Sequence, residues 1–179
     1  MASGRTPDRR PTRSRWSLVS EGLVADDAAR VSGEAPYEGT HYRLGRTLNS
    51  PQPLTRPHPP ILVGGGGEKK TPRLVAQYAD SCNIFSFPPF ADPAEAARKL
   101  DVLRQHCQDV GRDYDEIEKT AQDSYDLGPK GENVQQLIEH LHAVAESGFS
   151  VAYGTLHRLS EPGVLDRFVE EIVPAVAKF

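Results

Sequence analysis

Residues 61–79 read ILVGGGGEKKTPRLVAQYA, and this stretch decides the fold. A short apolar run, Ile61–Val63, is typical of a buried strand and stops abruptly at four consecutive glycines. After three charged residues, Thr71 is the expected N-cap of a helix, with Pro72 at its first position. The expected buried face of that helix carries Leu74, Val75, Tyr78 and Ala79. Strand, glycine loop and helix in this order form half of a βαβ unit.

The same order repeats three times towards the C-terminus. The expected strands are residues 82–85, 116–121 and 151–156. The expected helices occupy residues 93–110, 132–147 and 165–176. Strands that alternate with helices indicate an α/β protein with a parallel sheet.

The helix ends carry local signals. Asp92, followed by Pro93 and by Glu95, predicts the N-terminus of the helix at 93–110, and Gly111 predicts its end. In the same way Gly148 ends the next helix, and Pro174 is expected to kink or end the last one. The apolar stripe expected to be buried on the helix at 93–110 is Ala96, Leu100, Leu103, Cys107 and Val110.

The glycine run has a chemical interpretation as well as a structural one. Backbone N–H groups that no side chain shields can point at an anion, and the start of the following helix adds partial positive charge. The P-loop pattern GxxxxGK[ST] fails because Lys69 stands where a glycine is required, and the dinucleotide pattern GxGxxG fails at Lys69 or Lys70. The loop is therefore predicted to face a phosphate. A turn that needs only glycine's conformational freedom or close packing is the alternative.

Composition excludes several classes of protein. The chain has 179 residues with Lys+Arg 21 against Asp+Glu 25, a net charge of −4, which argues against general nucleic-acid binding. Mean hydropathy is −0.52, and no run reaches the ~18 apolar residues that would span a membrane. Two cysteines, Cys82 and Cys107, do not suggest a disulfide-stapled secreted module, and zinc spacings are absent. We expect a cytoplasmic protein without a metal.

Residues 1–35 differ from the rest of the chain. Within them, residues 1–15 hold five arginines against the single acid Asp8, and Met1 is their only large apolar residue. Such a stretch cannot bury enough surface to offset its ordering entropy, so we expect a disordered tail before a domain at 36–179. A transit peptide and a basic nucleic-acid arm are the alternatives.

The domain at 36–179 resembles the C-terminal half of luciferase-like oxidoreductases, in particular the class that uses the deazaflavin coenzyme F-420. The segments that carry this resemblance are YEGTHYRL (37–44), LNSPQP (48–53), RPHPPILVGGGG (56–67), ADSCNIF (79–85) and RKLDVLRQHCQDVGRDYDEIEKT (98–120). The closing segments GFSVAYGTLHRL (148–159) and EEIVPAVAKF (170–179) fit as well, and all of these segments occur in the same order as in the family.

The resemblance implies a (β/α)8 TIM barrel of which this chain holds about four C-terminal βα units, since a complete barrel takes about 250 residues. It implies that a deazaflavin or flavin binds at the C-terminal ends of the strands. The cofactor-binding residues would be Gly64, Gly65, Gly66, Gly67, Ser86 and Phe87. The family's usual catalytic acid or base belongs to the missing first half, so no catalytic residue is assigned.

The implied activity is hydride transfer between coenzyme F-420 and a small organic substrate, with the cofactor supplying the chemistry. An FMN- and oxygen-dependent monooxygenase is one alternative. An inactive, truncated fragment that binds only an anion or a partner chain is another. Because a half-barrel leaves sheet edges uncovered, the expected partner is a second copy of the chain or the missing N-terminal half.

Overall fold

The structure is a computed structural model that describes residues 36–38, 43–45, 54–55 and 59–179. The chain divides into two units, Met1–Pro59 and Pro60–Phe179. In the first unit, strand β1 (Tyr37–Glu38) pairs antiparallel with β2 (Arg43–Leu44), and an Arg43–Glu38 ion pair of 3.1 Å joins them. The predicted tail at 1–35 lies outside the described residues.

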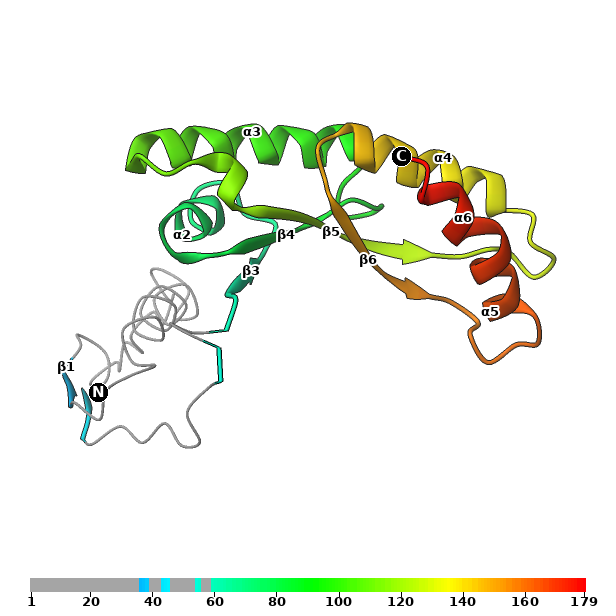
Figure 1. Ribbon diagram of the computed structural model, residues 1–179, viewed down its shortest axis with the longest axis horizontal. Helices are drawn as coiled ribbons and strands as arrows, with labels where there is room; N and C mark the ends of the chain where they lie inside the picture. Colours follow the sequence, from blue (N-terminus) through cyan, green and yellow to red (C-terminus); the bar gives the residue numbers. More distant parts are fainter. Residues whose placement is uncertain (1–35, 39–42, 46–53, 56–58) are drawn as a thin grey trace, which may run out of the picture. The chain divides into compact units, whose positions relative to one another are not determined.

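The second unit is built on a four-stranded parallel sheet in the order β3-β4-β5-β6 (Figure 1). Its strands are β3 (Leu62–Gly64), β4 (Ser81–Phe85), β5 (Glu118–Tyr125) and β6 (Val151–Leu156). The register aligns Cys82 with Val63 on one side and with Lys119 on the other. The four strands therefore end at a common edge, where the loops that lead into the helices begin.

Helices connect the strands and follow the last one. They are α2 (Thr71–Tyr78), α3 (Pro93–Val110), the 3-10 turn η1 (Tyr114–Glu116), α4 (Val134–Glu146), α5 (Val164–Arg167), the π-helical turn η2 (Phe168–Ile172) and α6 (Val173–Val176). The strand order never reverses, so right-handed crossovers place successive helices on the same face of the sheet. Figure 1 shows α3, α4 and α6 together on one side of it.

This winding is that of a barrel and not of a doubly wound sheet, whose strand order reverses and whose helices cover both faces. Four parallel strands, each followed by helix, make four βα units of a (β/α)8 barrel. The predicted fold class, α/β with about four units of a TIM barrel, is confirmed.

Two hydrophobic clusters hold the helices to the sheet. One lies between α2, α3 and the middle strands and includes Val75, Leu103, Cys107, Ile117 and Ala121. The other lies between α4, the C-terminal helices and the end of β5 and includes Tyr125, Leu127, Leu137, Leu141 and Ile172. The alternate residues of the strands point to the opposite face, which no helix of residues 60–179 covers.

The local signals at α3 are confirmed. The Asp92 side chain accepts a hydrogen bond of 2.8 Å from the backbone N–H of Glu95, as an N-cap does. Gly111 ends the helix with φ +70°, a left-handed conformation that favours glycine. Gly148 likewise follows α4 with φ +99°.

Three details of the sequence prediction are wrong, and a fourth is wrong in part. Thr71 is the first helical residue and not the N-cap, because Lys70 already has helical φ and ψ. Val110 is 44% exposed, since it lies in the last turn, past the end of the sheet-facing stripe. β5 runs to Tyr125 instead of Ala121, because polar side chains continue it at the sheet edge. Pro174 was expected to kink or end the last helix. It does not end it, since α6 continues to Val176, but a π-helical turn interrupts the α-helix directly before Val173 and Pro174.

Candidate functional site

The carboxyl edge of the sheet is where the loops after the four strands gather. Ligand sites of barrels lie at this edge, because the loops there vary without disturbing the strands that hold them. Of the six residues assigned to the cofactor from the sequence, Gly64 is the last residue of β3, and the other five follow β3 or β4 at this edge. They divide into the glycine loop, residues 64–67, and the pair Ser86 and Phe87.

Packing requires a glycine at one position of the loop. Gly65 donates its N–H to the carbonyl oxygen of Asn83 at 3.2 Å and has φ +157°. A Cβ atom placed on Gly65 would lie 2.9 Å from Oγ1 and 3.3 Å from Cγ2 of Thr71. A side chain at residue 65 would force the Thr71 side chain to shift, so glycine is the residue that fits the close approach between the end of β3 and the start of α2.

The next two glycines face open space. A Cβ on Gly66 would meet no atom within 4 Å, and one on Gly67 would meet only the Thr71 Oγ1 at 3.9 Å. Both residues are exposed, and neither has φ in the left-handed region. Nothing in the local packing therefore demands glycine at 66 or 67, and their backbone is open to a ligand.

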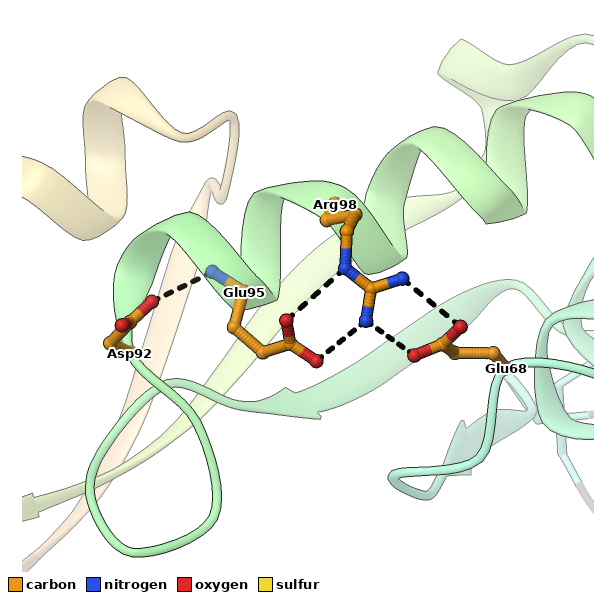
Figure 2. Close-up of polar contacts among 4 residues, drawn as sticks. All are labelled: Glu68, Asp92, Glu95 and Arg98. Carbon is orange, nitrogen blue, oxygen red and sulfur yellow. Dashed lines mark hydrogen bonds and ion pairs between the residues drawn. The ribbon is translucent and has the colours of Figure 1, made fainter.

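An ion-pair network ties the loop to α3, as Figure 2 shows. The Arg98 guanidinium contacts Glu68, which follows the glycines, at 3.0 and 2.5 Å, and Glu95, in the first turn of α3, at 3.1 and 2.7 Å. Hydrogen bonding to Arg98 holds the pKa of both carboxyls below its ordinary value. Because all three side chains are exposed, this network positions the loop more than it stabilises the fold.

Ser86 and Phe87 belong to different surroundings from those of the loop. Ser86 is fully buried, and its hydroxyl lies 3.2 Å from both the Gln122 carbonyl oxygen and the Asp123 Oδ2. Phe87 packs edge to face on Phe90, with ring centroids 5.5 Å apart. Among the described residues, Gly65 and Gly67 line one cavity and Phe87 lines another.

A buried carboxylate that the sequence analysis missed lies beside Ser86. Asp123 is 1% exposed, and its Oδ2 lies 2.6 Å from the Nε2 of His140 on α4. Its Oδ1 accepts the backbone N–H of Ser124 at 2.7 Å. The available signal was the polar run QDSY at 122–125, which continues β5 to the sheet edge.

A second polar group follows at the ends of β5 and β6. The Ser124 Oγ and the His157 Nε2 lie 2.7 Å apart. Arg158 pairs with Asp126 and has φ +54°, which non-glycine residues adopt at a cost of order 1–3 kcal/mol. Strain of this kind concentrates at functional sites, and here it turns the chain sharply after β6.

A cavity of about 380 Å³ opens between the loop after β4 and the start of α4. Its wall includes Phe87, Asp92, Asp123, Ser124, Asp126 and His140. The hydrogen-bonded pair of Asp123 and His140 therefore forms part of this wall. Within the described part of the chain, no three His, Cys, Asp or Glu side chains gather closely enough to hold a metal ion.

Sequence comparison adds a family and a relative. The profile of the family described as Luciferase-like monooxygenase matches residues 27–164, and so begins nine residues before the predicted domain boundary at 36. The uncharacterized protein Rv0953c of Mycobacterium tuberculosis strain H37Rv is 34% identical over 70 residues, which are 39% of this chain and 24% of that protein. The matched stretch thus spans about a quarter of the relative's length.

Solved structures with the same fold include an F-420-dependent secondary alcohol dehydrogenase in complex with an F-420–acetone adduct. It has a TM-score of 0.65 and 14% identity, and the match covers 89% of this chain and 59% of the dehydrogenase. Riboflavin lyase RcaE with modified FMN and riboflavin has a TM-score of 0.54 and 13% identity, over 80% of this chain and 48% of the lyase. No described helix is long and apolar enough to span a bilayer.

Proposed function

The chain belongs to the luciferase-like monooxygenase family, and from that premise we propose that it acts in an oxidoreductase that transfers a hydride between coenzyme F-420 and a small organic substrate. The similarity in fold to an F-420-dependent alcohol dehydrogenase supports this choice of cofactor. A flavin-dependent oxidoreductase is the second candidate, because riboflavin lyase with bound modified FMN shares the fold as well.

The observation that carries the proposal is the open backbone of Gly66 and Gly67 just before the N-terminus of α2. A phosphate can approach that backbone without meeting a side chain, and the first N–H groups of α2 add positive potential. Both F-420 and FMN carry such a phosphate. The residues present therefore fit the phosphate-bearing tail of either cofactor.

The remaining predicted residues take supporting roles in this proposal. When bound, the cofactor supplies the hydride chemistry, and the protein supplies binding and orientation. Ser86 acts as a positioning residue, because its buried hydroxyl fixes the start of the β4–α3 loop against β5. Phe87, next in that loop, lines the cavity and offers a contact for an apolar part of the cofactor or substrate.

We further propose that four more βα units close the barrel around the open face of this sheet, supplied by a second copy or by an N-terminal half. In residues 60–179, β3 and β6 each have a single neighbouring strand. Leu62 and Tyr153, on the face without helices, are 48% and 47% exposed. Pairing of edges and burial of such side chains is what barrel closure achieves.

The test is titration of the purified chain with F-420, FMN and riboflavin, followed by ligand fluorescence and by melting temperature. A ligand that binds only the folded protein raises its melting temperature by mass action. We expect F-420 to bind more tightly than FMN, and FMN more tightly than riboflavin, which lacks the phosphate. Preference for FMN would favour the second candidate, and binding of none of the three would overturn the proposal.

A further inference from the structure

Lys99, on α3, is only 7% exposed. Lysines are almost never buried to this degree unless they are paired. Within residues 59–179, however, no side-chain hydrogen bond and no ion pair reaches its ammonium group, since the carboxylates of Glu68 and Glu95 both pair with Arg98. Within residues 59–179, the burial of this charge is therefore not explained by a hydrogen-bond or ion-pair partner.

Lys99 and the glycine loop line the same small cavity. Long side chains on a helix lean towards its N-terminus, and the N-terminus of α3 lies at the carboxyl edge of the sheet. Lys99 lines a small cavity of about 10 Å³ together with Gly65, Gly67 and Thr71. That space holds about one water molecule, so the lysine comes close to the underside of the loop and to the start of α2.

The charge of Lys99 acts on this neighbourhood. After the larger effect of Arg98, it contributes to the lowered pKa of Glu68, the residue that follows the glycines. Away from bulk water, a charge acts more strongly on a nearby anion than it does on an exposed surface.

We propose that Lys99 supplies a buried positive charge to a phosphate-binding site at the glycine loop, together with the open backbone of Gly66 and Gly67 and the N-terminus of α2. This inference rests on the proposed function and adds a charged residue to its phosphate site. The ligand class is a phosphate monoester or diester. Lys99 binds the ligand from below the loop, while the exposed Lys69 lies on the loop itself.

The experiment compares Lys99→Met and Lys99→Gln with wild type and with Arg104→Met, which removes an exposed charge from the same helix. Affinities for FMN and for riboflavin are measured together with melting temperature in the absence of ligand. We expect both Lys99 variants to lose about tenfold or more in FMN affinity, with riboflavin affinity unchanged. Without ligand, Lys99→Met should melt no lower than wild type, because methionine fills the same space without a buried charge. Arg104→Met should retain wild-type FMN affinity.

Several results would overturn the inference. Unchanged FMN affinity in the Lys99 variants would do so, and so would an equal loss of FMN and riboflavin affinity. A lower melting temperature with unchanged affinity, or failure of both variants to fold, would assign Lys99 to neutralising Glu68 and Glu95. If wild type itself binds FMN no better than riboflavin, the phosphate site of the proposed function fails first, and the role of Lys99 fails with it.

Discussion

Replacing Gly66 by alanine tests whether this glycine serves a ligand or the fold. The new Cβ would meet no atom within 4 Å, and the backbone lies outside the left-handed region. Gly→Ala at a compatible position stabilises a protein by about 0.4–1 kcal/mol, chiefly by restricting the unfolded chain. Loss of one hydrogen bond from the backbone to a charged phosphate costs about 1.5–3 kcal/mol of binding, or about 10- to 150-fold in affinity.

Gly65→Ala is the matched control in the same loop. Its Cβ would lie 2.9 Å from the Thr71 Oγ1, so we expect a loss of about 1–3 kcal/mol in the free energy of unfolding. Urea denaturation measures stability, and titration with FMN and riboflavin measures binding. The reasoning is refuted if Gly66→Ala binds FMN as wild type does, or if it unfolds as readily as Gly65→Ala.

Three further predictions concern charge and burial. A carboxyl whose pKa is lowered in the folded state adds stability above its ordinary pKa and loses it on acidification. Arg98→Met should therefore melt below wild type at about pH 7, and this difference in melting temperature should narrow as the pH falls below the ordinary carboxyl pKa. A constant difference in thermal melts would contradict this. Burial raises the pKa of Tyr125 to about 12, so this phenol adds stability below pH 10 that is lost as the pH rises. In urea denaturation, the free energy of unfolding of wild type should fall by up to about 2–3 kcal/mol between about pH 10 and 12, and that of Tyr125→Phe should fall by less. Equal decreases in the two proteins would argue against burial of Tyr125 as the cause. Asp123→Ala removes the hydrogen-bond acceptor for His140 and for the Ser124 N–H, and should lower the free energy of unfolding in urea by about 3 kcal/mol. Asp123→Asn keeps a side-chain oxygen and should lose less. Equal losses in the two variants would exclude the hydrogen bonds as the reason.

Features that depend on neighbouring residues were predictable from the sequence. The cap at Asp92 and the stop at Gly111 each involve residues at most four positions apart, and both occur as expected. β6 occupies the residues predicted for it, 151–156, because an apolar run after a helix stop has few other conformations. The order of strands and helices was likewise sufficient to indicate a parallel sheet and, with the family resemblance, part of a barrel.

Features that depend on how distant strands and helices align were not predictable from the sequence. Asp123 and His140 are 17 positions apart and meet only because β5 extends to the sheet edge and α4 packs against it. The burial of Lys99 has the same origin, since a lysine on an amphipathic helix is ordinarily assigned to the solvent. Periodicity places residues on a face but does not show which part of that face another loop covers.

The two interpretations of the glycine run, a ligand loop and a turn that needs glycine, do not exclude each other once the positions are separated. Close packing against Thr71 accounts for Gly65 alone. It leaves Gly66 and Gly67 without a structural reason, in a loop whose following residue, Glu68, is fixed by Arg98. A loop held at both ends and open in the middle presents its backbone in one conformation, and this lowers the entropic cost of binding an anion there. The phosphate hypothesis therefore depends on residues 66 and 67, and substitutions at residue 65 cannot test it.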